Sequence, residues 1–186
     1  MLICGVDIAA RKGGHNCGLA LIDGARLRAL DEPADDLLWL GAIDGTSLAA
    51  VAAVVKDLRA RAAGQGLLLA LERQYTKLDP SMTEKLIGSR LRFEIVAEIN
   101  GVPFELNHAS TWQTILKVLG PDTPMKLTKP KKAEPGKKQL APRPIRDTKA
   151  AARLLCSRLY PGVALTGDQC DALLQARYSA WQRRAA

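Results

Sequence analysis

Two short apolar runs that each end in an acidic residue place the strongest constraint on how this chain of 186 residues can fold. The run LLLALE, from Leu67 to Glu72, is almost continuously apolar, which is typical of a parallel strand buried on both faces. The N-terminal run MLICGVD ends in the same way, at Asp7. Since helical patterns alternate with the later strand patterns, we predict an α/β fold with a mixed sheet.

Turn and capping signals divide the rest of the chain into elements. The segment HNCGLALID follows a glycine-containing turn and is predicted to pair with the N-terminal run as a β-hairpin. Ser81 with Glu84, and Ser110 with Gln113, have the spacing of helix capping boxes. The predicted order, in one domain, is three strands (2–7, 15–22, 37–43), a helix from Thr46 or Ser47, a strand (67–72), a helix (81–100), a strand (102–106) and three helices (110–119, Asp147 or Thr148 to Leu159, and one from Asp168).

The net charge of +8 is concentrated in one segment, residues 121–149. This segment holds nine basic and three acidic residues, a net charge of +6, together with six of the ten prolines of the chain. Prolines at this density exclude a helix or a central strand. We therefore predict an extended, flexible, cationic loop at about 121–146, inserted within the domain, that contacts a nucleic-acid backbone. A solvated linker is the alternative interpretation.

Other features narrow the class of protein. No apolar run reaches the length of a membrane-spanning helix and no basic leader precedes an apolar stretch, so we expect a cytoplasmic protein without membrane contact. The four cysteines form no CxxC pair and are predicted to be buried free thiols. His15 and His108 are predicted to be surface or hydrogen-bonded imidazoles, and Trp112 to be a core residue.

Four acidic residues are predicted to meet at one edge of the sheet. Asp7 and Glu72 end predicted strands, while Asp168 and Asp171 share a face of the first turn of the last helix. Four carboxylates at the carboxyl ends of strands would repel one another without a cation. Oxygen-only ligands suit Mg²⁺ or Mn²⁺, and two such ions can drive phosphodiester hydrolysis. A nuclease is one interpretation of these acids, and ordinary helix caps and turn residues are the other.

Six segments follow one another in a telling order: ICGVDIAA with GLALID, LLLALERQY, EKLIGSRLRFEIVAEINGVPFEL, WQTILKVLG, DTKAAARLL and GDQCDALLQA. Taken together they resemble the RuvC family of Holliday-junction resolvases, which has an RNase H-like fold. In the third segment the resemblance implies that Gly88 and Arg90 lie near the DNA. The resemblance implies that Asp7, Glu72, Asp168 and Asp171 are catalytic acids that bind two Mg²⁺ ions, with Mn²⁺ as the alternative ion. It also implies that Lys149 stabilises charge on the phosphate and that the products carry 5′-phosphates.

The same resemblance implies a homodimer that cuts two opposed strands of a four-way or branched DNA. We accordingly expect the protein to act in the cytoplasm of a bacterial cell, or in the host cytoplasm if the chain is phage-encoded. The predicted helix from Met82 to Asn100 has too many apolar residues for one narrow stripe. Burial against both the core and a dimer partner explains this, and so does complete burial within a monomer.

Predicted DNA contacts come from the cationic loop and from positions near the acids. Lys117 is a candidate for a lysine that the family carries where this chain has Trp112, and Tyr75 is predicted either to stack on a base or to pack beside its strand. Two rival functions remain: an RNase H-like nuclease acting on RNA or RNA–DNA hybrids, and a junction-binding protein without catalysis. The full set of predicted DNA-contacting residues is Arg73, Tyr75, Arg90, Lys117, Lys126, Lys129, Lys131, Lys132, Lys137, Lys138, Arg143 and Arg146.

Overall fold

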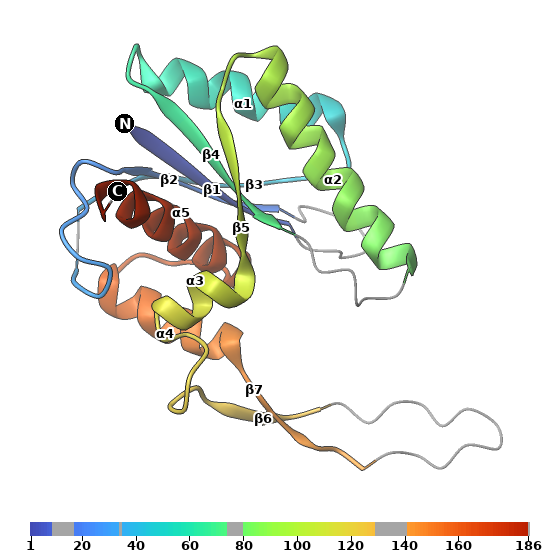
Figure 1. Cartoon of the computed structure of the whole chain (residues 1–186), viewed down its shortest axis with the longest axis vertical. Coiled ribbons are helices and arrows are strands. Elements are labelled where there is room, and N and C mark those ends of the chain that lie inside the picture. Colours follow the sequence, from blue (N-terminus) through green and yellow to red (C-terminus); the bar gives the residue numbers. More distant parts are fainter. Residues whose placement is uncertain (9–16, 34, 74–79, 129–140, 186) are drawn as a thin grey trace.

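A five-stranded mixed sheet forms the centre of the computed structural model, which describes residues 1–8, 17–33, 35–73, 80–128 and 141–185 (Figure 1). In the strand order β3-β2-β1-β4-β5, β1 and β2 form the predicted antiparallel hairpin, and β4 lies parallel to both β1 and β5. This confirms the predicted α/β fold. The strands of this sheet are β1 (Leu2–Ile8), β2 (Cys17–Asp23), β3 (Leu37–Ile43), β4 (Leu67–Arg73) and β5 (Phe104–His108).

Helices cover both faces of the sheet, as the continuous apolar runs require. Figure 1 shows α1 and α2 on one face and α3, α4 and α5 on the other. Along β4, Leu69 and Leu71 belong to the core shared with α1 and α2, whereas Leu68 and Ala70 belong to the core shared with α5. Side chains that alternate across the strand therefore fill both cores from one short run. The helices are α1 (Leu48–Ala62), α2 (Pro80–Ile99), α3 (Ala109–Ile115), α4 (Thr148–Leu159) and α5 (Gly167–Ala185).

The backbone of α5 packs directly against β1 and β2 at two glycines. A β-carbon at Gly5 would overlap the carbonyl oxygen of Ala172, and one at Gly18 would overlap the carbonyl group of Asp168. Only glycine allows a helix backbone to come this close to a strand. Because Gly18 pairs with Asp7 in the hairpin register, this approach brings the first turn of α5 beside Asp7.

The other half of α5 is held by a buried arginine. Arg177 has no exposed surface, and its guanidinium donates to three carbonyl oxygens of residues 29–32 at 2.6–3.2 Å. The same group lies 3.4 Å from a carboxylate oxygen of the buried Asp36 and 2.9 Å from the hydroxyl of Tyr160. A buried charge is tolerated only with extensive pairing of this kind, which here engages both terminal nitrogens of the guanidinium, while Nε has no partner among the described residues. This network fixes the β2–β3 connection against α5.

Part of the predicted cationic loop is a two-stranded antiparallel ribbon, β6 (Met125–Leu127) with β7 (Pro144–Arg146), which extends away from the sheet (Figure 1). Thr128 donates its N–H to the carbonyl of Arg143 at 2.9 Å, which continues the pairing outward. The expectation of a loop is thus corrected for these residues. Both strands are edges, where a proline costs no ladder hydrogen bond.

Two predicted N-caps are confirmed and a predicted capping box is wrong. Ser47 accepts from the N–H of Ala50, and Asp147 accepts from the N–H of Ala150. In contrast, α3 begins at Ala109, so Ser110 is not its cap. Since Lys117 adopts a left-handed conformation (φ 57°), α3 ends at Ile115 rather than near Leu119. The Ser81–Glu84 box lies outside the described side chains, and the strand expected at 102–106 lies at 104–108.

Several smaller predictions are confirmed. All four cysteines are buried and free, and Trp112 is completely buried. His108 is exposed, with Nε2 3.3 Å from a guanidinium nitrogen of Arg73, while His15 lies outside the described residues. Within the described part of the chain, no helix combines the length and the apolar character needed to cross a bilayer.

Replacing Gly5 by alanine is expected to destabilise the protein by about 1–3 kcal/mol, because the new methyl group forces α5 away from β1. Urea unfolding followed by circular dichroism measures this free energy. The control is Gly66→Ala, whose β-carbon would meet nothing nearer than Met1 Cγ at 3.6 Å. Equal stability of the two variants would contradict the direct packing of α5 on the sheet.

Candidate active site

The sheet and α5 bring the four predicted acids together into one group, the acid cluster of Asp7, Glu72, Asp168 and Asp171. Val6 pairs with Leu71 in the parallel β1–β4 register, so the next residues, Asp7 and Glu72, end neighbouring strands side by side. The first turn of α5 adds the two aspartates, and each of the three other acids raises the pKa of Asp7. The predicted convergence of the four carboxylates is therefore observed.

One ammonium group lies among three of these carboxylates. Lys149, on the first turn of α4, has its Nζ 2.9 Å from Asp168 Oδ1, 3.1 Å from Asp171 Oδ2 and 3.9 Å from Asp7 Oδ2. The three acid side chains are at most 11% exposed, whereas that of Lys149 is 42% exposed. Lys149 thus enters the acid cluster from solvent, at the point where the ribbon joins α4.

A different residue caps α5, which weighs against the alternative interpretation of its two aspartates. Thr166 Oγ1 accepts from the N–H of Gln169 at 3.2 Å, and Gln169 Oε1 accepts from the N–H of Thr166 at 3.0 Å. This is a reciprocal capping box. The carboxylates of Asp168 and Asp171 point instead at Lys149, so capping does not account for their position.

Burial and mutual repulsion raise the pKa of Asp7, Glu72 and Asp171. Burial raises the pKa of Asp7 well above its ordinary value, and the carboxylates of Glu72 and Asp171 raise it further. Burial and then Asp171 raise the pKa of Glu72 to about 7. Burial alone would lower the pKa of Lys149, but the surrounding aspartates outweigh it and raise that pKa. The acid cluster therefore has more negative charge than one lysine balances.

The donor set fits a hard divalent cation. Oδ2 of Asp7 is buried and accepts no hydrogen bond from any described residue, which leaves a lone pair directed into the acid cluster. All the available donors are carboxylate oxygens, the ligands preferred by Mg²⁺ and Mn²⁺. As they stand, no three Asp, Glu, His or Cys side chains of the described residues form a ready-made site for an ion. The position of Lys149 among the carboxylates offers a physical reason.

The predicted DNA contacts fall into three groups. Arg73 ends β4 beside Glu72. Arg146 is exposed on β7 and Arg143 is exposed just before it, while Lys126 of β6 pairs with Asp147 at 2.9 Å. Arg90 and Lys117 form a second group and lie in different surroundings. Tyr75, Lys129, Lys131, Lys132, Lys137 and Lys138 lie outside the described residues.

Two of these residues lie in surroundings that do not by themselves support the predicted role. Arg90 is only 18% exposed and pairs with Glu94 at 2.7 Å on α2, and its DNA contact stays a prediction. Lys117 lines a hollow of about 390 Å³ together with Trp181, ten residues beyond Asp171 on α5. Such a separation is about 15 Å along a helix, so Lys117 does not replace a lysine at the acid cluster.

Arg153, a cation near the acid cluster, was not among the site residues predicted from the sequence. Arg153 lies one turn after Lys149 on α4, and it lowers the pKa of Asp171. Its guanidinium comes within 3.0 Å of where a β-carbon on Gly167 would lie, which places it beside the first turn of α5. The i, i+4 spacing from Lys149 is the signal that would have identified it.

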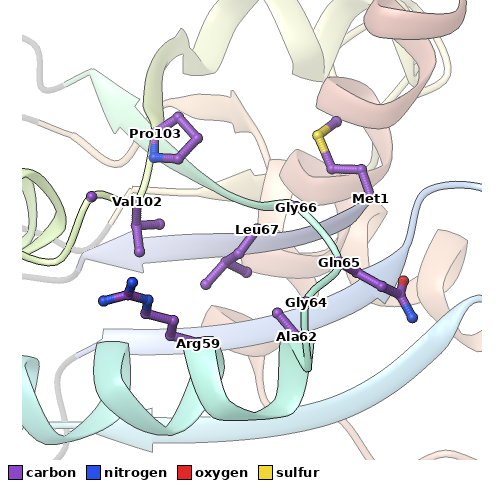
Figure 2. A pocket seen from close by; sticks show the side chains of 10 residues that line it. Met1, Arg59, Ala62, Gly64, Gln65, Gly66, Leu67, Val102 and Pro103 are labelled. Carbon is purple, nitrogen blue, oxygen red and sulfur yellow. The ribbon is translucent and has the colours of Figure 1, made fainter.

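Hollows elsewhere on the surface do not belong to this site. Figure 2 shows one of about 420 Å³ lined by Met1, Arg59, Gly66, Val102 and Pro103. Arg59 lies in the last turn of α1, and the others lie at the start of β1 and β4 and before β5, at the opposite end of the sheet from the acid cluster. The acids instead occupy the carboxyl ends of the parallel strands, where sites of open α/β sheets form.

Comparison with protein-family models and with curated proteins gives no match. Solved structures do match over nearly the whole chain. Thermus thermophilus RuvC superposes with a TM-score of 0.62 at 14% sequence identity, covering 100% of this chain and 97% of that chain. T. thermophilus RuvC in complex with a Holliday junction substrate gives a TM-score of 0.61 at 14% identity, covering 99% and 96%. The chain has the RuvC fold. At this identity, the likeness to RuvC establishes the fold, and the roles of individual residues rest on geometry.

Without metal, the thermal unfolding midpoint is expected to fall as the pH rises from about 5 to about 8. Glu72 has a pKa of about 7 in the folded chain and 4.5 as its ordinary value, so the folded state holds its proton over a window in which the unfolded chain has released it. Calorimetry in EDTA measures the effect. Glu72→Gln should flatten the profile and Glu98→Gln, an exposed change on α2, should not; a midpoint that rises with pH would contradict the prediction.

Proposed function

We propose that this protein is a metal-dependent endodeoxyribonuclease that resolves four-way DNA junctions by paired hydrolysis, leaving 5′-phosphates. The observation that carries the proposal is the acid cluster, which gathers four carboxylates at the edge of the sheet, three of them around one lysine. The RuvC fold and a structural neighbour described as RuvC in complex with a Holliday junction substrate support the junction as substrate. The cytoplasm is the proposed place of action.

The acid cluster would hold two Mg²⁺ or Mn²⁺ ions. When bound, such ions supply a water of lowered pKa and neutralise charge on the leaving 3′ oxygen. Asp7, whose buried carboxylate lies between β1 and the first turn of α5, would be one of the residues that hold them. Lys149 is long enough to reach a phosphate at the mouth of the site and stabilise charge that develops there. Burial raises the pKa of the neighbouring Cys17 thiol to about 12, so this side chain is no nucleophile and water is proposed instead.

The cationic ribbon would hold the DNA backbone near the acids. Arg146 is exposed on β7 and Arg143 just before it, and β7 leads through Asp147 alone into the helix that carries Lys149. Contacts of this kind to phosphates position the duplex without reading its sequence. The predicted contacts of Lys129, Lys131, Lys132, Lys137 and Lys138 extend the same role and belong to this proposal.

A second copy of the chain is proposed to pack on α2. One face of this helix is buried against the core, including Phe93, while Leu91, Ile95 and Ile99 are 41%, 50% and 78% exposed. These three residues are spaced four apart and form one apolar stripe on the outer face. A C₂ dimer through this stripe would give two sites for two opposed strands of a junction.

The wild type with Mg²⁺ is expected to introduce paired, symmetric nicks in a labelled four-way junction and to be inactive in EDTA. Asp7→Asn and Asp168→Asn should each lower the rate at least about 100-fold, because each removes a charged ligand of the reacting centre. Asp57→Asn, on the exposed face of α1, is the control and should cleave as the wild type does.

The same assay separates the rival functions. Cleavage of an RNA–DNA hybrid with the junction left intact would favour an RNase H-like activity. Binding of the junction without cleavage, in either Mg²⁺ or Mn²⁺, would favour a junction-binding protein without catalysis.

Sedimentation velocity tests the dimer independently. Ile95→Glu places a charge in the middle of the exposed stripe and is expected to convert a dimer into a folded monomer. Lys56→Glu, an exposed change on α1, is the matched control and should remain dimeric. A wild type that sediments as a monomer would contradict the proposed interface.

A further inference from the structure

The ammonium of Lys149 fills space that a metal ion would need. Its distances of 2.9, 3.1 and 3.9 Å place it between oxygens of Asp168, Asp171 and Asp7. Oxygens that share one Mg²⁺ lie about 2.1 Å from the ion, so an ion among these three carboxylates and the ammonium exclude each other. The ammonium of Lys149 therefore occupies the position where the proposed function requires a divalent metal ion.

The side chain of Lys149 is built to leave this place. It is 42% exposed, although its partners are at most 11% exposed, so it reaches inward from the surface. Its flexible four-carbon stem allows the ammonium to swing toward solvent while the backbone of α4 stays fixed by the Asp147 cap. The carboxylates have no such freedom, since β1 and the backbone-packed first turn of α5 hold them.

We propose that Lys149 is the resident counter-ion of the acid cluster: it balances the carboxylates while metal is absent, is displaced when a divalent cation binds, and is thereby released toward the DNA phosphate. This inference rests on the proposed metal-dependent nuclease and adds an exchange of one cation for another. Removing the lysine leaves the cluster more negative and open, so a divalent cation binds more tightly without it.

Arg153 provides a control that distinguishes this exchange from a general electrostatic effect of nearby positive charge. It carries the same charge one turn further along α4 and acts on Asp171 through space. Among the described residues, however, it forms no ion pair within 4.0 Å. A long-range effect would make both cations matter alike, whereas displacement from the site depends on Lys149 alone.

The test measures Mn²⁺ binding to the full chain by electron paramagnetic resonance of the free ion, without DNA. Lys149→Met is expected to bind Mn²⁺ at least about tenfold more tightly than the wild type. The Mn²⁺ affinity of Arg153→Met is expected to lie within about twofold of the wild-type affinity. Lys149→Arg keeps the charge and should bind no more tightly than the wild type. Asp168→Asn should weaken binding.

Thermal unfolding supplies a second readout and shows that each variant folds. Lys149→Met should melt below the wild type in EDTA, where the carboxylates lose their counter-ion, and should gain more from Mn²⁺ than the wild type does.

Each outcome has a distinct meaning. Wild-type binding with no gain in Lys149→Met, or an equal gain in Arg153→Met, would overturn the exchange and leave the proposed nuclease standing. Binding of Mn²⁺ to neither the wild type nor Lys149→Met would overturn the proposed metal centre, and the exchange with it. Tight binding by Lys149→Met alone would support the exchange most strongly.

Discussion

The contact of the α5 backbone with the β1–β2 hairpin underlies the rest of the structure. Two glycines, Gly5 and Gly18, remove the side chains that would otherwise separate helix from sheet. As a result, a carboxylate at the end of β1 and two more on the first turn of α5 come within reach of one ammonium. A separation wider by one side chain would leave the same acids as unrelated surface charges. The catalytic geometry proposed for this chain is therefore first a matter of backbone packing.

The acid cluster and the Arg177 network differ in how far their buried charges are balanced. Arg177 and Asp36 are fully buried, and the guanidinium is surrounded by carbonyl, hydroxyl and carboxylate oxygens. At the other end of α5, the carboxylates outnumber their lysine and the pKa of Asp7 is raised. Extensive pairing gives a rigid anchor, whereas an excess of one charge is what a site needs to attract a cation. One helix thus holds a fixed half and a reactive half.

Much of this was predictable from local patterns. Apolar runs ending in acids predicted β1, β4 and the positions of Asp7 and Glu72, and the aspartate spacing predicted the shared face of α5. The ribbon was not predicted, because prolines that exclude a central strand are tolerated on two edge strands. The end of α3 was misplaced because Lys117 adopts a conformation that glycine usually supplies. Arg177 escaped notice because its partners are distant in sequence and no short motif marks it, and Arg153 because only its spacing from Lys149 marks it.

Because of the ribbon, the number of residues between Thr128 and Arg143 has little influence on the geometry of the acid cluster. Thr128 and Arg143 are hydrogen-bonded to each other, so the fourteen residues between them begin and end at neighbouring points. The free energy of closing such a segment grows only slowly with its length. Insertions, deletions or wholesale exchange there would leave the first turn of α4 where it is. A change in the length of the chain between Thr128 and Arg143 is therefore expected to leave the position of Lys149 at the acid cluster unchanged.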